Sequence, residues 1–427
     1  MSTIVDPVHA GGTGIGDFFA IDGRAWALAC QKGLNPAVAY LVLARGSGPD
    51  QRTTSWSVKA IETYTGIGRP RALKAIESLQ RTGLVRITQR GTRPRYYVVP
   101  ANEVPGCAGY PPPSLTSEEQ KVFDQIVAGY HVPKSVSTAD QATQWGTWWP
   151  RKIADQLVLK RWAQTDAGGR YKAIPYDAEG AAKPDWIWLP NSLITGAGEN
   201  LVPPVELVRQ TQNTAALQLL IDLYHVQNLA DDGGVHWCTI RQNFDREMVG
   251  QRGGFIVYGF SPATLLAWGD RPLLRPYMIG EMEMVDGRQR DRGWKTFWDA
   301  FQQLRQLSLI DFVGHLIEAD TANAEVIHPY AIGNGEASEQ LVARAAHKAA
   351  EAMLTPGQRQ WAEQHSLRLV PVRAHIAEAQ MVGIARLRYR PRTNATAAWY
   401  ARMTEWDEMA ARFYELAAEA SGLRQTG

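Results

Sequence analysis

Cysteine is scarce in this chain: three residues among 427, far apart at Cys30, Cys107 and Cys238. Such spacing provides neither a disulfide framework nor a close set of metal ligands, so a reducing compartment is expected. No apolar run approaches the roughly 18 residues that a membrane-spanning helix needs. The first residues lack a basic segment followed by an apolar one, so we expect no secretion signal and a cytoplasmic, nucleoid-associated location.

Recognisable catalytic chemistry is also missing. The run GGTGIG at residues 11–16 lacks the Lys-Ser/Thr ending of a phosphate-binding loop, and we interpret residues 1–16 as a flexible lead-in. His225, His236 and Cys238 come closest to a metal site, but no fourth ligand is evident. No nucleophile elbow or metalloprotease motif is present. We therefore expect no enzyme, no metal and no cofactor; a DNA-processing site assembled only by the fold is the alternative.

The net charge of +2 conceals a very uneven distribution of charge. Eight Arg and Lys residues lie between Arg69 and Arg95 against the single acid Glu77, which gives a local charge of +7. The same stretch keeps apolar residues first at helical and then at strand spacing, so the charge belongs to a small folded unit. A surface of this kind favours phosphate, because each neutralised phosphate releases counterions.

The helices of this unit are predicted from caps and periodicity. Residues 35–45 predict a helix that Asn35 caps, and residues 57–65 predict a short helix that Gly66 ends in the left-handed conformation. A tight turn then leads to a helix over residues 69–82. Its buried side is expected to carry Leu73, Ile76 and Leu79.

Two alternating segments, residues 84–89 and 95–99, follow and predict a hairpin. Helix, short helix, tight turn, helix and hairpin in this order resemble the winged-helix form of helix-turn-helix DNA-binding proteins, over residues 17–101. The resemblance implies that the helix over residues 69–82 enters the major groove. It also implies that the wing, residues 90–95, lies along the DNA backbone.

The spacing of the polar residues favours the same interpretation. Arg71, Lys74, Ser78 and Arg81 recur at positions that share one helical face. The candidate DNA-binding residues are Arg69, Arg71, Lys74, Ser78, Arg81, Arg90, Arg93 and Arg95. The alternative is a solvated face in a protein–protein adaptor of a larger nucleoprotein or defence assembly.

A second unit is expected over residues 185–333, with an insertion at about 250–292. When Gly83-Leu84 is aligned with Ser308-Leu309, the buried pattern is kept: Leu73 aligns with Trp298, Ile76 with Phe301, Leu79 with Leu304 and Ile87 with Phe312. The exposed pattern is lost, because the polar face becomes Thr296, Asp299, Gln303 and Gln306. Either this copy is structural or dimerising, or it contacts DNA through the preceding basic residues Arg288, Arg290, Arg292 and Lys295.

The remaining segments are predicted more coarsely. Residues 102–114 are a Pro- and Gly-rich linker, and residues 115–184 a helical and hairpin segment that opens with a Thr116–Glu119 capping box. Its tryptophans either stack on bases or form a core. Residues 334–427 are expected to be a helical region, with a seam at Trp399, Met403, Trp406, Ala410, Phe413 and Ala417 that either dimerises or packs on its own domain. A second possible phosphate contact is the alternating row Arg386, Arg388, Arg390 and Arg392.

These patterns predict a mainly α fold with small β-hairpins, of α+β class, built from two winged-helix units and a helical C-terminal region. Tandem winged helices of unequal charge resemble plasmid replication initiators, in which one copy reads DNA and the other also mediates dimerisation. The expected function is sequence-specific binding of double-stranded DNA, as a transcriptional regulator or a replication initiator. A homodimer through the second unit or the C-terminal helices is a possible further partner, and no membrane is expected.

Overall fold

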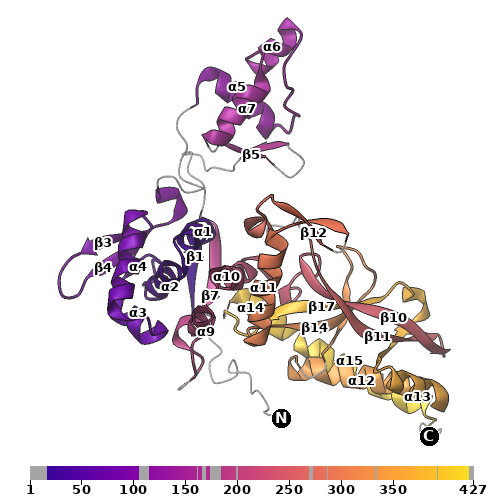
Figure 1. The fold of residues 1–427 in the computed structure, drawn as a ribbon. Helices are drawn as coiled ribbons and strands as arrows, with labels where there is room; N and C mark the ends of the chain where they lie inside the picture. The colour runs from indigo at the N-terminus through magenta and orange to yellow at the C-terminus, as the bar shows by residue number, and fades with distance from the viewer. Residues whose placement is uncertain are drawn as a thin grey trace. The chain divides into compact units, whose positions relative to one another are not determined.

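A computed structural model describes residues 17–104, 115–160, 162–165, 170–173, 184–198, 201–268, 273–285, 287–331, 334–391 and 393–422. It mixes helices and strands (Figure 1). The chain divides into two compact units. One comprises Phe19–Trp188 with Arg209–Thr214, and the other Met1–Phe18, Leu189–Val208 and Ala215–Gly427. The lead-in expected at residues 1–16 lies outside the described residues. Among those described, no helix combines the length and apolar character needed to cross a membrane.

The N-terminal module contains the helices and the hairpin that the sequence predicts. Its elements are β1 (Phe18–Asp22), α1 (Gly23–Gln31), α2 (Leu34–Arg45), β2 (Thr53–Thr54), α3 (Val58–Thr65), α4 (Arg69–Arg81), β3 (Val85–Gln89), β4 (Arg95–Val98) and η2 (Ala101–Glu103). The predicted cap at Asn35 is wrong: α2 begins at Leu34, and Gly33 takes the N-cap position at φ 99°. Helix α1 was not expected; the Asp22 carboxylate caps it by accepting from the Arg24 amide.

Helix α4 follows a turn that glycine makes possible. Gly66 ends α3 at φ 62°, in the left-handed region that glycine adopts without strain. The buried stripe of α4 is Ala72, Ala75, Ile76 and Leu79. Leu73, expected in this stripe, is instead 43% exposed. At 3.6 residues per turn it lies about 110° round the helix from the centre of the stripe, which is too far to reach the core.

Strands β3 and β4 pair antiparallel, and β2 joins them to give the order β2-β4-β3. Val85 pairs with Val98 and Ile87 with Tyr96, and the register shifts between Ile87 and Gln89. A β-bulge of this kind bends a hairpin and increases its local twist. The hairpin therefore extends from the helices with residues 90–94 at its tip.

The middle module has a core of its own. Its elements are α5 (Ser117–Val127), α6 (Ala139–Trp145), α7 (Pro150–Leu159), β5 (Ala163–Thr165) and β6 (Tyr171–Ala173). The predicted capping box is confirmed, with Thr116 and Glu119 bonded reciprocally at the start of α5. Trp145 packs in the core with Val122, Ala154 and Leu157.

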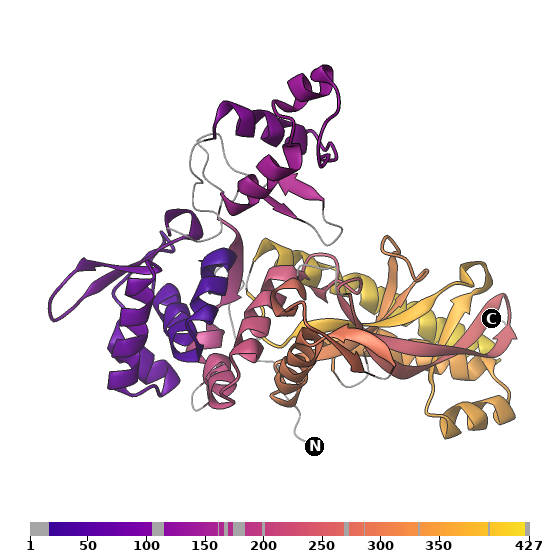
Figure 2. The same ribbon diagram turned by 45° about the horizontal axis from the view of Figure 1, so that its top comes forward.

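The C-terminal unit is organised around an eight-stranded sheet in the order β15-β14-β17-β10-β11-β16, joined by β8 and β9. After β7 (Trp186–Pro190), which pairs with β1, the elements are α8 (Ser192–Thr195), α9 (Pro204–Gln210), α10 (Thr214–Val226), β8 (Gln227–Asn228), β9 (Gly234–Val235), β10 (Ile240–Arg252), β11 (Phe255–Ala267), η3 (Arg275–Tyr277), β12 (Met282–Val285), β13 (Arg288–Asp291), α11 (Gly293–Gln306), β14 (Ile310–Ile317), β15 (Val326–Tyr330), α12 (Ala337–Met353), α13 (Pro356–Gln364), β16 (Arg368–Arg373), η4 (Ala374–Ile376), β17 (Gln380–Leu387), α14 (Asn394–Ala401) and α15 (Met403–Ala420). Figure 2 shows the long β10–β11 hairpin and the helices beside the sheet.

The region over residues 334–427, predicted to be helical, contains the helices α12–α15, but the prediction misses β16 and β17, which are strands of this sheet. Seven consecutive residues of β17, Met381–Leu387, are buried. A strand buried on both faces shows no alternation, so its sequence cannot be told from that of a buried helix. The seam on α14 and α15 packs within its own chain: Trp399, Trp406 and Ala410 form a cluster with residues of α12.

The junction between α11 and β14 repeats the junction between α4 and β3. The Leu84 amide donates to the Leu79 carbonyl at 3.0 Å, and the Leu309 amide donates to the Leu304 carbonyl at 3.0 Å. The residue before each leucine is left-handed, with φ 76° at Gly83 and 55° at Ser308. The two segments thus end a helix and begin a strand with the same backbone bonds, as the sequence alignment predicts.

The strands that follow also correspond, although one comes from an unexpected place. In the first module the strand order is β2-β4-β3. In the second unit β9 pairs with β17 and β17 pairs with β14, so the corresponding order is β9-β17-β14. β17, which begins at residue 380, therefore occupies the position of β4, whereas β15, the strand that directly follows β14, begins at residue 326. The sheet spans both sides of the boundary predicted at residue 333.

Ser308 is strained where Gly83 is not, because a side chain disfavours the left-handed region. We expect Ser308→Gly to raise the free energy of unfolding by about 1 kcal/mol, since only glycine adopts this region freely. The reciprocal change, Gly83→Ser, should lower it by a similar amount. Urea denaturation of both variants tests this; a loss of stability in Ser308→Gly would contradict it.

Candidate nucleic-acid interface

The outward face of α4 carries unpaired positive charge. Arg71, Lys74 and Arg81 are exposed, and none forms an ion pair within the described residues. Arg69 is exposed too and lies 3.8 Å from Glu62, a contact too long and open to neutralise it. Ser78 is half-buried at the edge of this face. The predicted cationic face is therefore present, with Leu73 added at its border.

The hairpin adds three more cations, two in its tip and one at the start of β4. Arg90, Arg93 and Arg95 are exposed and make no ion pair in the part of the chain that is described. Arg86, at the base of the hairpin, differs: it is bonded to the Glu103 carboxylate and lies 5.0 Å from the centre of the Tyr97 ring. The hairpin thus neutralises charge at its base and leaves it open at its tip.

The fold of the module explains why these charges face outward. Two of the four residues in the buried stripe of α4 are alanine, and the stripe packs against α2, whose residues Ala37–Ala44 are all buried. Alanine in such a stripe allows two helices to approach closely, which leaves the long basic side chains no place except the opposite face. Packing in the core therefore fixes the direction of the charged face.

The basic residues before α11 divide into two groups. Arg288 and Arg290 on β13 are exposed and make no ion pair among the described residues. Arg292 pairs with Glu281 at 2.9 Å, and Lys295 pairs with Asp299 at 3.0 Å. Only half of this predicted secondary contact remains available. The face of α11 itself presents Thr296, Asp299 and Gln306 as exposed residues and Gln303 as a half-buried one.

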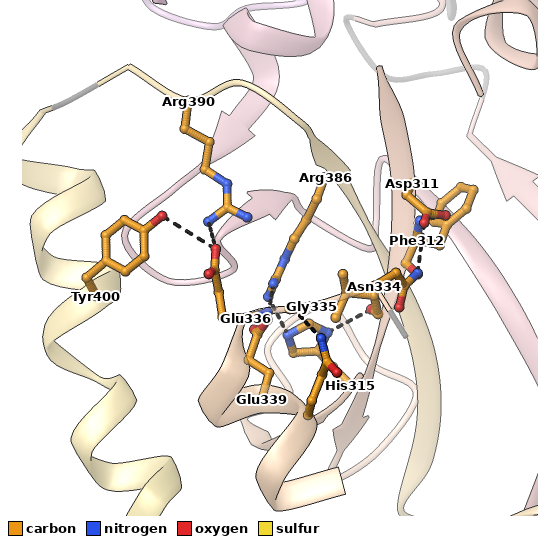
Figure 3. A network of polar contacts seen from close by, with 12 residues as sticks. Asp311, Phe312, His315, Asn334, Gly335, Glu336, Glu339, Arg386, Arg390 and Tyr400 are labelled. Atoms are coloured by element: carbon orange, nitrogen blue, oxygen red, sulfur yellow. Dashed lines mark hydrogen bonds and ion pairs between the residues drawn. The ribbon is translucent and has the colours of Figure 1, made fainter. Parts of the chain in front are cut away.

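Arg386, predicted as a possible phosphate contact, is instead buried at 4% exposure (Figure 3). Its Nη1 donates to Glu339 Oε2 at 2.6 Å, and its Nη2 lies 3.0 Å from His315 Nε2. The guanidinium also lies 4.8 Å from the ring centre of Trp399. The prediction is wrong because β17 is an inner strand of the sheet, so its side chains face the interior.

The protonation of this cluster follows from its surroundings. Burial, together with the charge of Arg386, lowers the pKa of His315 to about 3. The ring is then neutral and carries its hydrogen on Nδ1, which donates to the Val313 carbonyl at 2.9 Å. Burial opposes the charge of Glu339, but Arg386 holds the pKa of that carboxyl below its usual value. The cluster is therefore one ion pair completed by a neutral histidine.

The remaining residues of the predicted arginine row are Arg388, Arg390 and Arg392. Arg390 pairs with Glu336 at 3.5 Å, and Glu336 also accepts from the Tyr400 hydroxyl at 3.4 Å (Figure 3). Arg388 is half-buried over the ring of Tyr389. Arg392 lies outside the described residues. Alternation of arginines along the sequence indicates that they share one face of a strand, but it does not tell whether that face is exposed to solvent.

Two further features remain: for the first, the sequence leaves base stacking and core packing open, and the second is not predicted. Trp148 and Trp149 are both more than half exposed on the middle module. A largely apolar cavity of about 340 Å³ lies between the sheet and α15, and His328 is among its lining residues. The Nε2 atom of His328 is buried and has no hydrogen-bond partner among the described residues. No sequence motif predicts which of these side chains are exposed, because the fold decides their exposure.

Removing Arg386 should leave Glu339 buried as a lone charge. We expect Arg386→Met to lower the free energy of unfolding by about 3–5 kcal/mol, and a second change, Glu339→Gln, to restore part of this loss. Arg388→Met, at a half-exposed position, should cost less than about 1 kcal/mol. Denaturant titrations provide the measurement, and equal losses for the two arginines would contradict the burial of Arg386.

The described residues contain no group of three or more His, Cys, Asp and Glu side chains placed to hold a metal ion. In this part of the chain, Cys30 is a buried thiol and Cys238 is a half-buried thiol. No model of a known protein family, no curated protein and no solved structure matches this chain.

Proposed function

We propose that this protein binds double-stranded DNA sequence-specifically through α4 and the β3–β4 hairpin, in the manner of a winged helix. One observation carries the proposal: six exposed cations without ion pairs in the described residues are gathered on one helix and the hairpin beside it. They are Arg71, Lys74, Arg81, Arg90, Arg93 and Arg95. Phosphate is the partner that such a surface favours, since its binding releases counterions.

Helix α4 has the shape and chemistry of a reading element. Its 13 residues form a rod that the major groove of B-form DNA accommodates. Arginine can bond guanine with two hydrogen bonds, and an exposed acid such as Glu77 can accept from cytosine. Leu73 supplies an apolar surface at the edge of this face, suited to the methyl group of thymine.

The second unit supports a different role for its corresponding helix. The exposed face of α11 carries Asp299 and neutral side chains, so it does not attract phosphate as the cationic face of α4 does. Reading of the duplex by a helix is therefore assigned to the first copy alone, and the basic residues that the second copy leaves available are Arg288 and Arg290 on β13. A chain with one cationic and one neutral copy suits either a transcriptional regulator or a replication initiator, with the second copy devoted to structure or to association.

The first test concerns the reading helix. Arg71→Ala/Lys74→Ala should weaken binding to a DNA fragment selected by the wild-type protein by about 2–4 kcal/mol, because each residue contacts a base or a phosphate. A gel-shift titration measures this. The matched control, Lys32→Ala/Arg359→Ala, removes the same charge from exposed positions outside α4 and the hairpin and should change little. Equal affinities for wild type and the α4 variant would reject the assignment.

The second test concerns the hairpin. If its three arginines hold phosphates, Arg90→Ala/Arg93→Ala/Arg95→Ala should make the slope of log affinity against log salt shallower by about 2–3, since each phosphate contact contributes about 0.9. Sequence preference should persist, because the wing contacts the backbone and not the bases. Titrations at a series of salt concentrations measure the slope, and an unaltered slope would remove the wing from the interface.

A further inference from the structure

The middle module presents two adjacent indoles to solvent. Trp148 is 51% exposed and Trp149 is 59% exposed, in the segment between α6 and α7. Neither ring contacts another aromatic ring or a cation within the described residues. Trp145, three residues earlier, is buried with the apolar core of the module. The module therefore already has its core, and the two exposed indoles are additional to it.

The backbone holds this pair in place. Gly146 ends α6 at φ 72°, and Pro150 begins α7. The Trp148 carbonyl accepts from the Val136 amide at 3.2 Å, and the Trp149 amide donates to the Thr147 hydroxyl at 3.3 Å. A backbone fixed in this way loses little conformational freedom when the indoles that it carries bind a partner. Large apolar side chains held in solvent are typical of a binding surface.

Three lysines surround the same segment. The side chain of Lys121 lies against Gly146, where a β-carbon would be 2.6 Å from its Cδ. Lys134 belongs to the loop that Val136 ties to Trp148, and Lys152 stands in the first turn of α7. All three are exposed, and none forms an ion pair in the described part of the chain. The surface is thus both aromatic and cationic.

We propose that this surface, defined by Trp148, Trp149, Lys121, Lys134 and Lys152, binds single-stranded nucleic acid. Indole faces stack on unpaired bases, and ammonium groups attract the phosphates between them. A duplex does not fit, because its bases are already stacked and their faces are covered. A purely apolar partner would leave the lysines without a role. The surface is separate from α4, so it does not depend on duplex binding.

The experiment uses the full chain and a fluorescently labelled oligo(dT) of about 15 nucleotides, a length within the usual range of single-strand sites. Anisotropy titrations should show salt-dependent binding by the wild type. Trp148→Ala/Trp149→Ala should weaken it at least tenfold, whereas Trp148→Phe/Trp149→Phe should retain most of the affinity. Trp188→Ala, a change at an exposed indole outside the module, should leave it unaltered.

The lysines give an independent readout. Lys121→Ala/Lys134→Ala/Lys152→Ala should make the salt slope shallower by about 2, at about 0.7 per contact with a single strand. Arg71→Ala/Lys74→Ala should keep its single-strand affinity even where duplex affinity is lost, which separates this surface from α4.

Three outcomes would overturn the proposal. One is the absence of oligo(dT) binding by the wild type, and another is wild-type affinity in Trp148→Ala/Trp149→Ala. The third is competition by poly-glutamate at equal charge as effective as that by unlabelled oligo(dT), which would point to an acidic protein segment as the partner.

Discussion

The packing of α4 against α2 is the constraint on which the proposed duplex interface depends. Ala72, Ala75, Ile76 and Leu79 form the side of α4 that the core accepts, and this fixes how the helix is rotated about its axis. The basic side chains lie on the opposite side of the helix and therefore extend into solvent. The hairpin begins at Val85, soon after the helix ends, so its orientation follows from the same packing. A single apolar stripe thus sets the direction of two charged elements.

The two corresponding helix–strand junctions show which properties agree and which differ. The end of the helix, the left-handed residue and the first strand bonds agree between Leu79–Leu84 and Leu304–Leu309. The exposed residues do not agree, and the strand beside β14 comes from β17. Backbone bonds and buried contacts define the fold, whereas the surface carries no such constraint and can be assigned to another task.

The sequence predicts features that depend on neighbouring residues. The Thr116–Glu119 capping box, the left-handed Gly66 and the β3–β4 hairpin follow from local chemistry and are present. Features that depend on distant residues were missed or misjudged. The sequence predicts a helix where β17 lies because burial on both faces removes the alternation of a strand. It predicts Arg386 as a surface residue because its partner Glu339 is 47 residues away. Exposure of Trp148 and burial of Trp145 likewise depend on the assembled module.

The late position of β17 in the sequence determines the order in which the two sheets can fold. Strands β2, β3 and β4 lie within residues 53–98, so their sheet closes after few residues have been synthesised. The corresponding strands β9, β14 and β17 extend from residue 234 to residue 387. Closing this larger loop is slower and must wait for the last strand to leave the ribosome. Until then β14 and β10 present open edges, so a nascent or truncated chain combines a finished N-terminal hairpin with a sheet prone to pairing with other chains.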